Sequence, residues 1–72
     1  MAIELTKQRE AKGWTKRELG AVSNLHPARV GVIENGRVVP YDVELLRLAR
    51  ALNWQGDPRD LLKSAEADGA DA

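Results

Sequence analysis

The clearest pattern of apolar residues in the chain lies between residues 42 and 52. Four of them recur there at spacings of three and four positions: Leu45, Leu48, Ala49 and Leu52. This spacing places the four side chains on one face of an α-helix. We therefore predict an amphipathic helix over residues 42–52 whose apolar face belongs to the core and carries no functional site.

Weaker patterns predict four further helices, so the chain is expected to be all-α with five helices. On the first of them, Arg9 interrupts a thin apolar face that includes Ala2 and Leu5. A guanidinium on a buried face needs a carboxylate partner, because an unpaired internal charge is very costly. The predicted helices are 2–12, 16–23 with Leu19 buried, 27–34 with Val30 and Ile33 buried, and a last one that begins at Asp57 and Pro58 and buries Leu61 and Leu62.

The middle of the chain carries the signals of two short helices joined by a tight turn. Thr15 followed by Glu18 is a capping-box pair, in which each side chain binds a free backbone N–H group at the start of a helix. Asn24 stands where the chain must turn, and asparagine tolerates a left-handed backbone better than most residues. Pro27 suits the first turn of a new helix, which ends at Gly36. The stretch therefore predicts a helix-turn-helix motif.

Several residues and short runs occur in a characteristic order along the chain: Arg9, Glu18-Leu19, Leu25, Val30, the run Ile33-Glu34-Asn35-Gly36, Pro40 and the helix Leu45–Leu52. In this order they resemble the Cro/C1-type (XRE-family) helix-turn-helix of phage repressors and Cro proteins, and the similarity covers residues 3–62. The resemblance implies a lambda-repressor-like DNA-binding domain of five helices, with the helix-turn-helix at helices two and three.

The resemblance also implies structural roles for particular residues. In the family, an arginine of the first helix pairs with the glutamate at the end of the third, which implies an ion pair between Arg9 and Glu34. Gly20 stands where the family usually has alanine, at a position kept small because the third helix crosses there. We expect the domain to span residues 1–63, and the acidic residues 64–72 to form a disordered tail.

By resemblance, the third helix is the recognition helix, whose N-terminal residues would meet base edges in the major groove of DNA. The readout positions fall on Pro27, Ala28, Arg29 and Val32, with His26 at the helix start. Only Arg29 has a clear hydrogen-bonding code for a base, while Ala28 and Val32 could contact thymine methyl groups. His26 has two interpretations, since it could contact DNA or simply bind a backbone N–H group at the helix start.

Four further residues are candidates for contacts with the DNA backbone. Lys16 stands at the start of the second helix, where free N–H groups attract phosphate, and Arg17 is its neighbour on another face. In the family, the loop after the third helix lies along the DNA backbone, which implies phosphate contacts for Arg37 and Tyr41. Arg37 could instead be a solvated cation favoured by the helix dipole, and Tyr41 could pack against the proline of the loop.

Similar proteins often dimerise through the last helix and the loop before it, which makes Trp54, Leu61 and Leu62 candidates for an interface. Tryptophan is a frequent anchor of protein interfaces. The competing interpretation places the three residues in the closed core of a monomer. A chain of 72 residues has a marginal core, so dimerisation would help to stabilise it.

Composition narrows the functional classes. The chain has no cysteine, so neither a disulfide nor a thiolate metal site can form, and its one histidine cannot build a metal site alone. It shows no membrane-spanning pattern, no signal peptide and no catalytic constellation. We therefore expect a cytoplasmic protein of a bacterium or a phage-infected cell that is not an enzyme and that uses no metal or cofactor.

The net charge is zero, but its distribution along the chain is uneven. Residues 1–40 carry seven basic and four acidic residues, a net charge of +3, and residues 41–72 carry a net charge of −3. Such asymmetry is typical of a chain with one end facing a polyanion, although ordinary surface patterning produces it too.

The leading hypothesis is a sequence-specific transcriptional regulator, acting as a repressor, that binds a palindromic operator in double-stranded DNA as a homodimer. The fold could instead serve as a protein-interaction module, such as an antitoxin or an anti-activator. This alternative is motivated by the zero net charge and by an apolar face of Ala28, Val32 and Val38. A third possibility is that the domain binds DNA as a monomer or within a larger complex.

Overall fold

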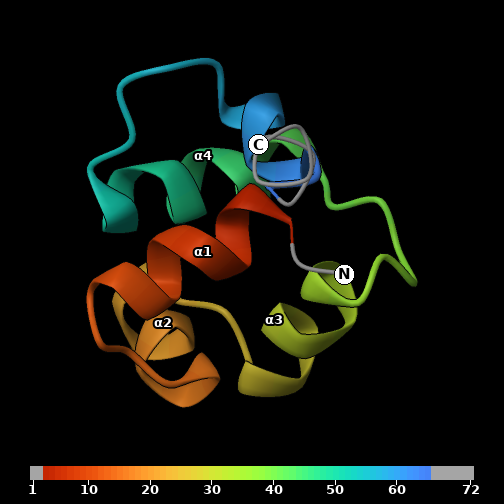
Figure 1. The fold of residues 1–72 in the computed structure, drawn as a ribbon. Helices are drawn as coiled ribbons and strands as arrows, with labels where there is room; N and C mark the ends of the chain where they lie inside the picture. Colours follow the sequence, from red (N-terminus) through yellow and green to blue (C-terminus); the bar gives the residue numbers. More distant parts are fainter. Residues whose placement is uncertain (1–2, 66–72) are drawn as a thin grey trace.

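Four α-helices and one short 3₁₀ helix make up residues 3–65, the part of the chain that this computed structural model describes (Figure 1). Within that part, the one backbone bridge of β type joins Ile3 to Ser64, and no helix is long and apolar enough to cross a membrane. The ranges predicted for the second, third and fourth helices are confirmed. The elements are α1 (Glu4–Ala11), α2 (Lys16–Ser23), α3 (Pro27–Glu34), α4 (Asp42–Leu52) and the 3₁₀ helix η1 (Pro58–Leu62).

The fifth helix departs from the prediction, because η1 is a 3₁₀ helix of five residues rather than an α-helix. It begins as expected, with the Asp57 side chain accepting a hydrogen bond from a backbone N–H group of the first turn. At Lys63 the backbone becomes extended, and the Glu4 N–H donates to Lys63 O at 2.7 Å. Pairing with the start of α1 therefore ends the helix early.

Ser64 and Ala65, which the sequence analysis assigned to the tail, pack onto this fold. Ser64 forms the antiparallel bridge with Ile3, and Ala65 is buried. The rest of the expected tail, residues 66–72, lies outside the described residues, as does Ala2 of the predicted first helix.

Both ends of α2 have the local chemistry that the sequence predicted. Thr15 Oγ1 accepts a hydrogen bond from the Glu18 N–H at 3.1 Å, and Glu18 Oε1 accepts one from the Thr15 N–H at 2.8 Å, so the capping box is present. At the other end, Asn24 has a φ of 61°, in the left-handed region that asparagine enters at a lower cost than most residues. The reversal at Asn24 brings α3 directly against α2.

Side chains from all five elements meet in one core. In Figure 1, α2 and α3 form the lower end of the molecule, and α4 with η1 forms the upper end. Removing apolar side chains from water is the main favourable term in folding, and each element of this small chain contributes at least one of them. The most deeply buried, none more than 1% exposed, are Leu5, Leu19, Val30, Ile33, Leu48 and Leu61.

The two helices of the helix-turn-helix approach closely at Gly20. A side-chain carbon added to Gly20 would lie 2.6 Å from the Leu25 carbonyl oxygen and 3.3 Å from the Pro27 nitrogen. Both neighbours are backbone atoms, so they cannot rotate away as a side chain would. The close approach therefore requires glycine here, in spite of its low helix propensity.

A buried ion pair joins α1 to the end of α3. Arg9 Nε donates to Glu34 Oε2 at 2.8 Å and Arg9 Nη2 donates to Glu34 Oε1 at 3.2 Å, and the two side chains are 11% and 3% exposed. Arg9 Nη1 donates to Trp14 O at 2.7 Å, and Thr6 Oγ1 donates to Glu34 Oε1 at 3.0 Å. Both charges thus have the hydrogen-bonding partners that an ion pair needs in a protein interior.

Two glycines inside helices allow a matched test of the α2–α3 packing. We expect Gly20→Ala to lower the free energy of unfolding by about 1–3 kcal/mol, because the clash outweighs the gain in helix propensity. Gly31→Ala should raise it by about 0.5–1 kcal/mol, since an added carbon there would lie 3.9 Å from Lys16 Cδ, its nearest neighbour. Urea unfolding followed by circular dichroism measures both effects, and a stabilised Gly20→Ala would contradict this account.

The Arg9–Glu34 pair predicts a large effect from one conservative change. Glu34→Gln should lower the free energy of unfolding by about 3 kcal/mol, because it leaves a buried guanidinium without its counter-charge. Replacing both partners, Arg9→Met with Glu34→Leu, should cost clearly less, because no charge then remains buried. The same urea titration compares the two proteins. A double variant less stable than Glu34→Gln would show that the charge imbalance is not the cause.

Candidate nucleic-acid interface

Apart from Arg29, the residues of α3 that stay outside the core are small. Ala28 is exposed, and Pro27, Gly31 and Val32 are half-buried. His26 caps the helix, with its Nδ1 accepting a hydrogen bond from the Ala28 N–H at 3.0 Å, so the capping interpretation describes its position in this structure. Small side chains allow the backbone of a helix to come close to another surface. The outer face of α3 is therefore shaped for close contact.

Exposed cations lie on α2 and on the loop that follows α3. A carbon built on Gly31 would lie 3.9 Å from Lys16 Cδ, so the Lys16 side chain runs beside the middle of α3. Arg17 and Arg37 are also exposed. None of the three cations forms an ion pair within residues 3–65. Three positive charges on the helix-turn-helix and its following loop are therefore open to an anionic partner.

Arg29, the residue predicted to read bases, is engaged within the chain. Its Nε donates to Glu44 Oε2 at 2.8 Å, and its Nη2 donates to Glu44 Oε1 at 2.9 Å. The Arg29 and Glu44 side chains are 29% and 12% exposed. The guanidinium carbon also lies 5.6 Å from the centre of the Tyr41 ring, in reach of a cation–π contact. Arg29 is thus held between α3 and α4 rather than extended freely into solvent.

Glu44 links the start of α4 to this pair. Its Oε1 also accepts a hydrogen bond from the Tyr41 N–H at 2.9 Å. The hydrogen bond from Arg29 lowers the pKa of Glu44, the Tyr41 N–H lowers it further, and burial opposes both effects. The bond to Glu44 in turn raises the pKa of Arg29. The pair therefore stays charged at neutral pH.

Sequence reasoning did not single out Glu44. A capping box is recognised by serine or threonine three positions before the glutamate, and the residue at that position here is Tyr41. The partner, Arg29, lies 15 positions earlier in the chain. Neither the local signal nor the spacing of a single helix could therefore have found the contact.

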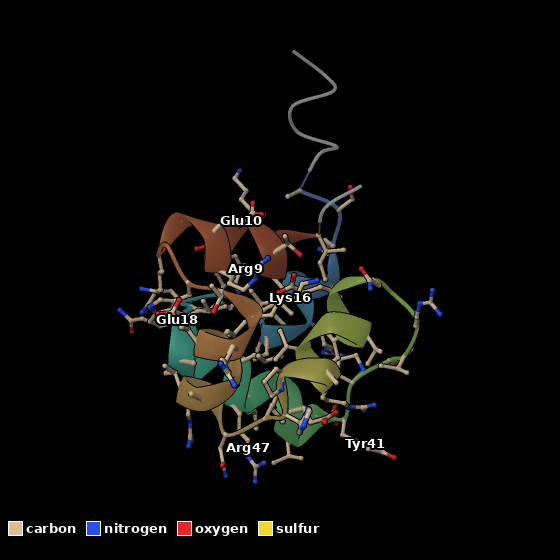
Figure 2. The ribbon with its side chains drawn as sticks, turned by 90° about the horizontal axis from the view of Figure 1, so that it is seen from below. Arg9, Glu10, Lys16, Glu18, Tyr41 and Arg47 are labelled. Carbon is tan, nitrogen blue, oxygen red and sulfur yellow. The ribbon has the colours of Figure 1, made fainter. Side chains whose placement is uncertain are left out.

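Two further arginines were also missed by the sequence analysis. Arg47 and Arg50 are exposed on α4, and neither forms an ion pair in the described part of the chain. In Figure 2, Arg47 and Tyr41 project from the same edge of the molecule. The two arginines stand beside a surface hollow of about 390 Å³ at the end of α2, which is lined by Val22, Ser23, Asn24, Arg47, Arg50 and Ala51.

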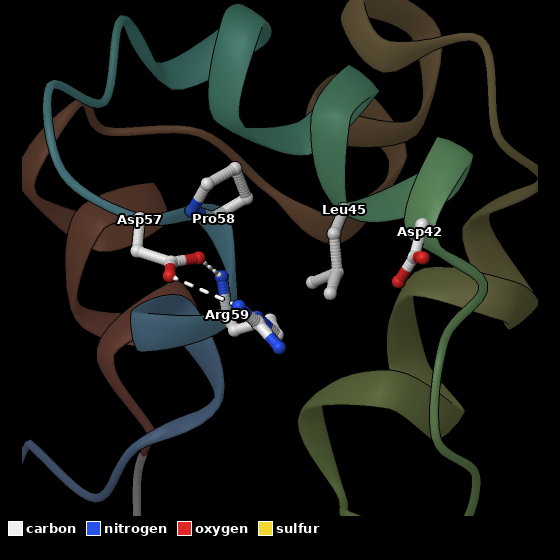
Figure 3. A pocket seen from close by; sticks show the side chains of 5 residues that line it. All are labelled: Asp42, Leu45, Asp57, Pro58 and Arg59. Atoms are coloured by element: carbon white, nitrogen blue, oxygen red, sulfur yellow. Dashed lines mark hydrogen bonds and ion pairs between the residues drawn. The ribbon is translucent and has the colours of Figure 1, made fainter.

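A second pocket, of about 300 Å³, lies between the start of α4 and η1 (Figure 3), lined by Asp42, Leu45, Asp57, Pro58 and Arg59. The Arg59 N–H donates to Asp57 Oδ1 at 2.9 Å and lowers the pKa of Asp57, with a further contribution from the Arg59 side chain. Carboxylates on two sides of this pocket disfavour a phosphate group. We therefore leave it out of the candidate interface.

The three residues predicted for a dimer interface differ in accessibility. Leu61 is fully buried, because η1 turns it into the core, so a contact made by the surface of this fold does not include it. Trp54 and Leu62 are half-buried and pack against the core. Trp54 Nε1 donates to Asp57 O at 2.9 Å. For Leu61, the monomer-core interpretation fits the structure.

A family model described as a helix-turn-helix domain matches residues 1–62 of the chain. No curated protein and no solved structure matches it. The matched range includes all four α-helices and η1, and with them every residue of the candidate interface.

The Arg29–Glu44 pair predicts a pH dependence of stability. Because the pKa of Glu44 in the folded chain lies below its ordinary value of 4.5, the unfolded chain binds more protons just below that pH. The free energy of unfolding should therefore fall as the pH drops from about 5 to 3. In Glu44→Gln the fall should be smaller but not absent, since the pKa of Asp57 is lowered too. Urea titrations across this range measure the slope, and equal slopes in both proteins would contradict the assignment.

Proposed function

Because the chain belongs to the helix-turn-helix domain family, we propose that it is a sequence-specific DNA-binding protein that regulates transcription. In its specific form, the proposal is a repressor of the Cro/C1 type. Two copies would bind a palindromic operator as a homodimer, each with α3 in the major groove of one half-site. A dimer bound over a promoter would then exclude polymerase sterically.

One observation carries the proposal, the outer face of α3 together with the exposed cations on α2 and on the loop that follows α3. The major groove of B-form DNA admits an α-helix, and the phosphates along both of its edges attract lysine and arginine. Lys16 runs beside the middle of α3, and Arg37 follows the end of the same helix. A helix with small outward side chains and flanking positive charges has the shape and the charge that this groove requires.

The predicted contact residues divide by their chemistry. Lys16, Arg17 and Arg37 would bind phosphates and fix the register of the protein on the duplex, a role that carries no sequence information. Ala28 and Val32 would contact thymine methyl groups from α3. His26, Pro27 and Tyr41 would stand at the edges of this contact, near the first turn of α3 and in the loop before α4.

The proposed homodimer needs apolar surface that is open to a second copy of the chain. Trp54 and Leu62 remain candidates for its interface, because both keep part of their apolar surface exposed. Two recognition helices in successive major grooves would lie ~34 Å apart, so the operator should be an inverted repeat with that spacing.

A second candidate function is that of a protein-interaction module, for example an antitoxin or an anti-activator. The observation in its favour is a group of large apolar side chains that are 48–84% exposed, mostly on the loop before α4 and on α4 itself: Val22, Val39, Tyr41, Val43 and Leu46. Exposed apolar residues that gather in one region mark interaction surfaces more often than single ones do.

Selection of bound duplexes from a random DNA pool, at two salt concentrations, tests the proposal. We expect enrichment of an inverted repeat and an affinity that falls steeply as the salt concentration rises, because phosphate contacts release counterions. Enrichment of a single half-site would support a monomer instead. Weak, salt-sensitive retention without any motif would favour the interaction module.

The selected duplex then allows a sharper comparison of two lysines. Lys16→Ala should weaken binding to all sequences about equally and reduce the slope of log K against log salt by about one. Lys63→Ala is the control, since it removes the same charge from the residue after η1, where Lys63 pairs with Asp60 at 3.0 Å. Fluorescence anisotropy at several salt concentrations measures both. Equal losses in the two variants would contradict a phosphate contact by Lys16.

A further inference from the structure

The ion pair with Glu44 occupies only one side of the Arg29 guanidinium. Glu44 accepts from Nε and Nη2, the two groups along that side. Nη1 and the outer N–H of Nη2 bind no partner within residues 3–65. The Arg29 side chain is 29% exposed, so the ion pair with Glu44 does not close it off from solvent.

The free end of the guanidinium has a defined recognition chemistry. Arginine presents its N–H groups in a planar fork, so a carboxylate on one side leaves two parallel donors at the end. A partner with two hydrogen-bond acceptors side by side can bind both of these donors. Guanine offers them in the major groove as O6 and N7, and a phosphate offers two oxygens.

The partner that holds Arg29 is itself held firmly. Glu44 Oε1 also accepts from the Tyr41 N–H, and only 12% of the Glu44 side chain is exposed. The Tyr41 ring lies 5.6 Å from the guanidinium carbon and adds a second contact to the Arg29 side chain. Side-chain ordering that is already complete before binding does not oppose the binding. The direction of the free end is therefore set in the unbound protein.

We propose that Glu44 is a positioning residue for DNA recognition, which orients Arg29 so that its free end reads a guanine in the major groove. This inference rests on the proposed function. Arg29 lies in the first turn of α3, where a recognition helix meets base edges. A base contact needs a fixed direction, whereas a phosphate contact is served by flexible cations. Lys16 and Arg37, which have no carboxylate partner within residues 3–65, fit that second role.

The test is the selection from a random duplex pool, run in parallel on the wild type and four variants. We expect the wild type to enrich guanine at one fixed position of each half-site, and Arg29→Ala to lose the preference at that position alone. Glu44→Gln should reduce the preference for guanine over other bases at least about fivefold. Glutamine keeps the shape and one oxygen for the Tyr41 N–H, but its amide nitrogen cannot accept a hydrogen bond from arginine.

Asp57→Asn is the matched control. Asp57 resembles Glu44, because it pairs with an arginine, Arg59, and also accepts a hydrogen bond from a backbone N–H group at the start of a helix. The substitution removes one negative charge from this pair. The net charge of the variant therefore equals that of Glu44→Gln, and its guanine preference should match the wild type. Arg29→Lys covers the case in which Glu44→Gln fails to fold by circular dichroism. It keeps the charge and the Glu44–Tyr41 bond but removes the planar fork. An ammonium cannot pair with Glu44 along one side and present two parallel donors at its end, so the guanine preference should fall while the affinity is retained.

Each other outcome overturns the inference in a recognisable way. A guanine preference that is undiminished in folded Glu44→Gln, or in Arg29→Lys, shows that no positioned fork reads the base. Uniformly weaker binding by Arg29→Ala, with a salt slope reduced by about one, places Arg29 on a phosphate. If the wild type enriches no sequence at all, the proposed function fails and this inference fails with it, whereas the first two outcomes leave the proposed function intact.

Discussion

The rest of the structure depends on the buried ion pair between Arg9 and Glu34. Leu5 and Arg9 are the two buried residues of α1, so apolar side chains alone attach this helix only weakly to the core. The pair adds directional bonds, and the Arg9 contact with the Trp14 carbonyl extends them to the junction with α2. Directional bonds fix how two helices are rotated against each other, which apolar contacts leave adjustable. Because Glu34 is the last residue of α3, the pair also fixes the end of that helix.

Two ion pairs hold α3 against its neighbouring helices, and the Arg9–Glu34 pair is one of them. The Arg29–Glu44 pair holds the first turn of the helix against α4, and the Arg9–Glu34 pair holds the last residue against α1. At the start of the helix, the close approach of Gly20 to Leu25 and Pro27 sets the distance to α2. The helix is therefore fixed at both ends, and its small outward residues are left free. An interface built on such a rigid element places its contacts more accurately than one built on a loop.

How far the sequence predicts this arrangement depends on the range of each interaction. The bounds of α2, α3 and α4 follow from apolar spacing and from capping residues a few positions apart, so local patterns were sufficient. The shape of η1 was not predictable in this way, because a distant strand-like contact between Ile3 and Ser64 ends it. The sequence predicted that Leu61 lies on a buried side, but whether that side faces the core or a second copy of the chain was left open, because it depends on how η1 docks. Arg9 and Glu34 were paired by resemblance to a family, and Arg29 and Glu44 had neither a local signal nor a family pattern to join them.

The pairing of charges also explains how a chain of zero net charge can present a positive surface. Arg9 with Glu34 and Arg29 with Glu44 cancel as pairs, so their acids do not oppose a polyanion. From residue 15 to residue 41, this leaves three cations, Lys16, Arg17 and Arg37, against one acid, Glu18. Glu18 is committed to the cap of α2. Two acids of the second half, Asp57 and Asp60, lie at η1, at the other end of the molecule (Figure 1). Association with a charged partner follows this local field rather than the net charge. Within the described residues, the helix-turn-helix and the loop after it therefore carry a local excess of positive charge.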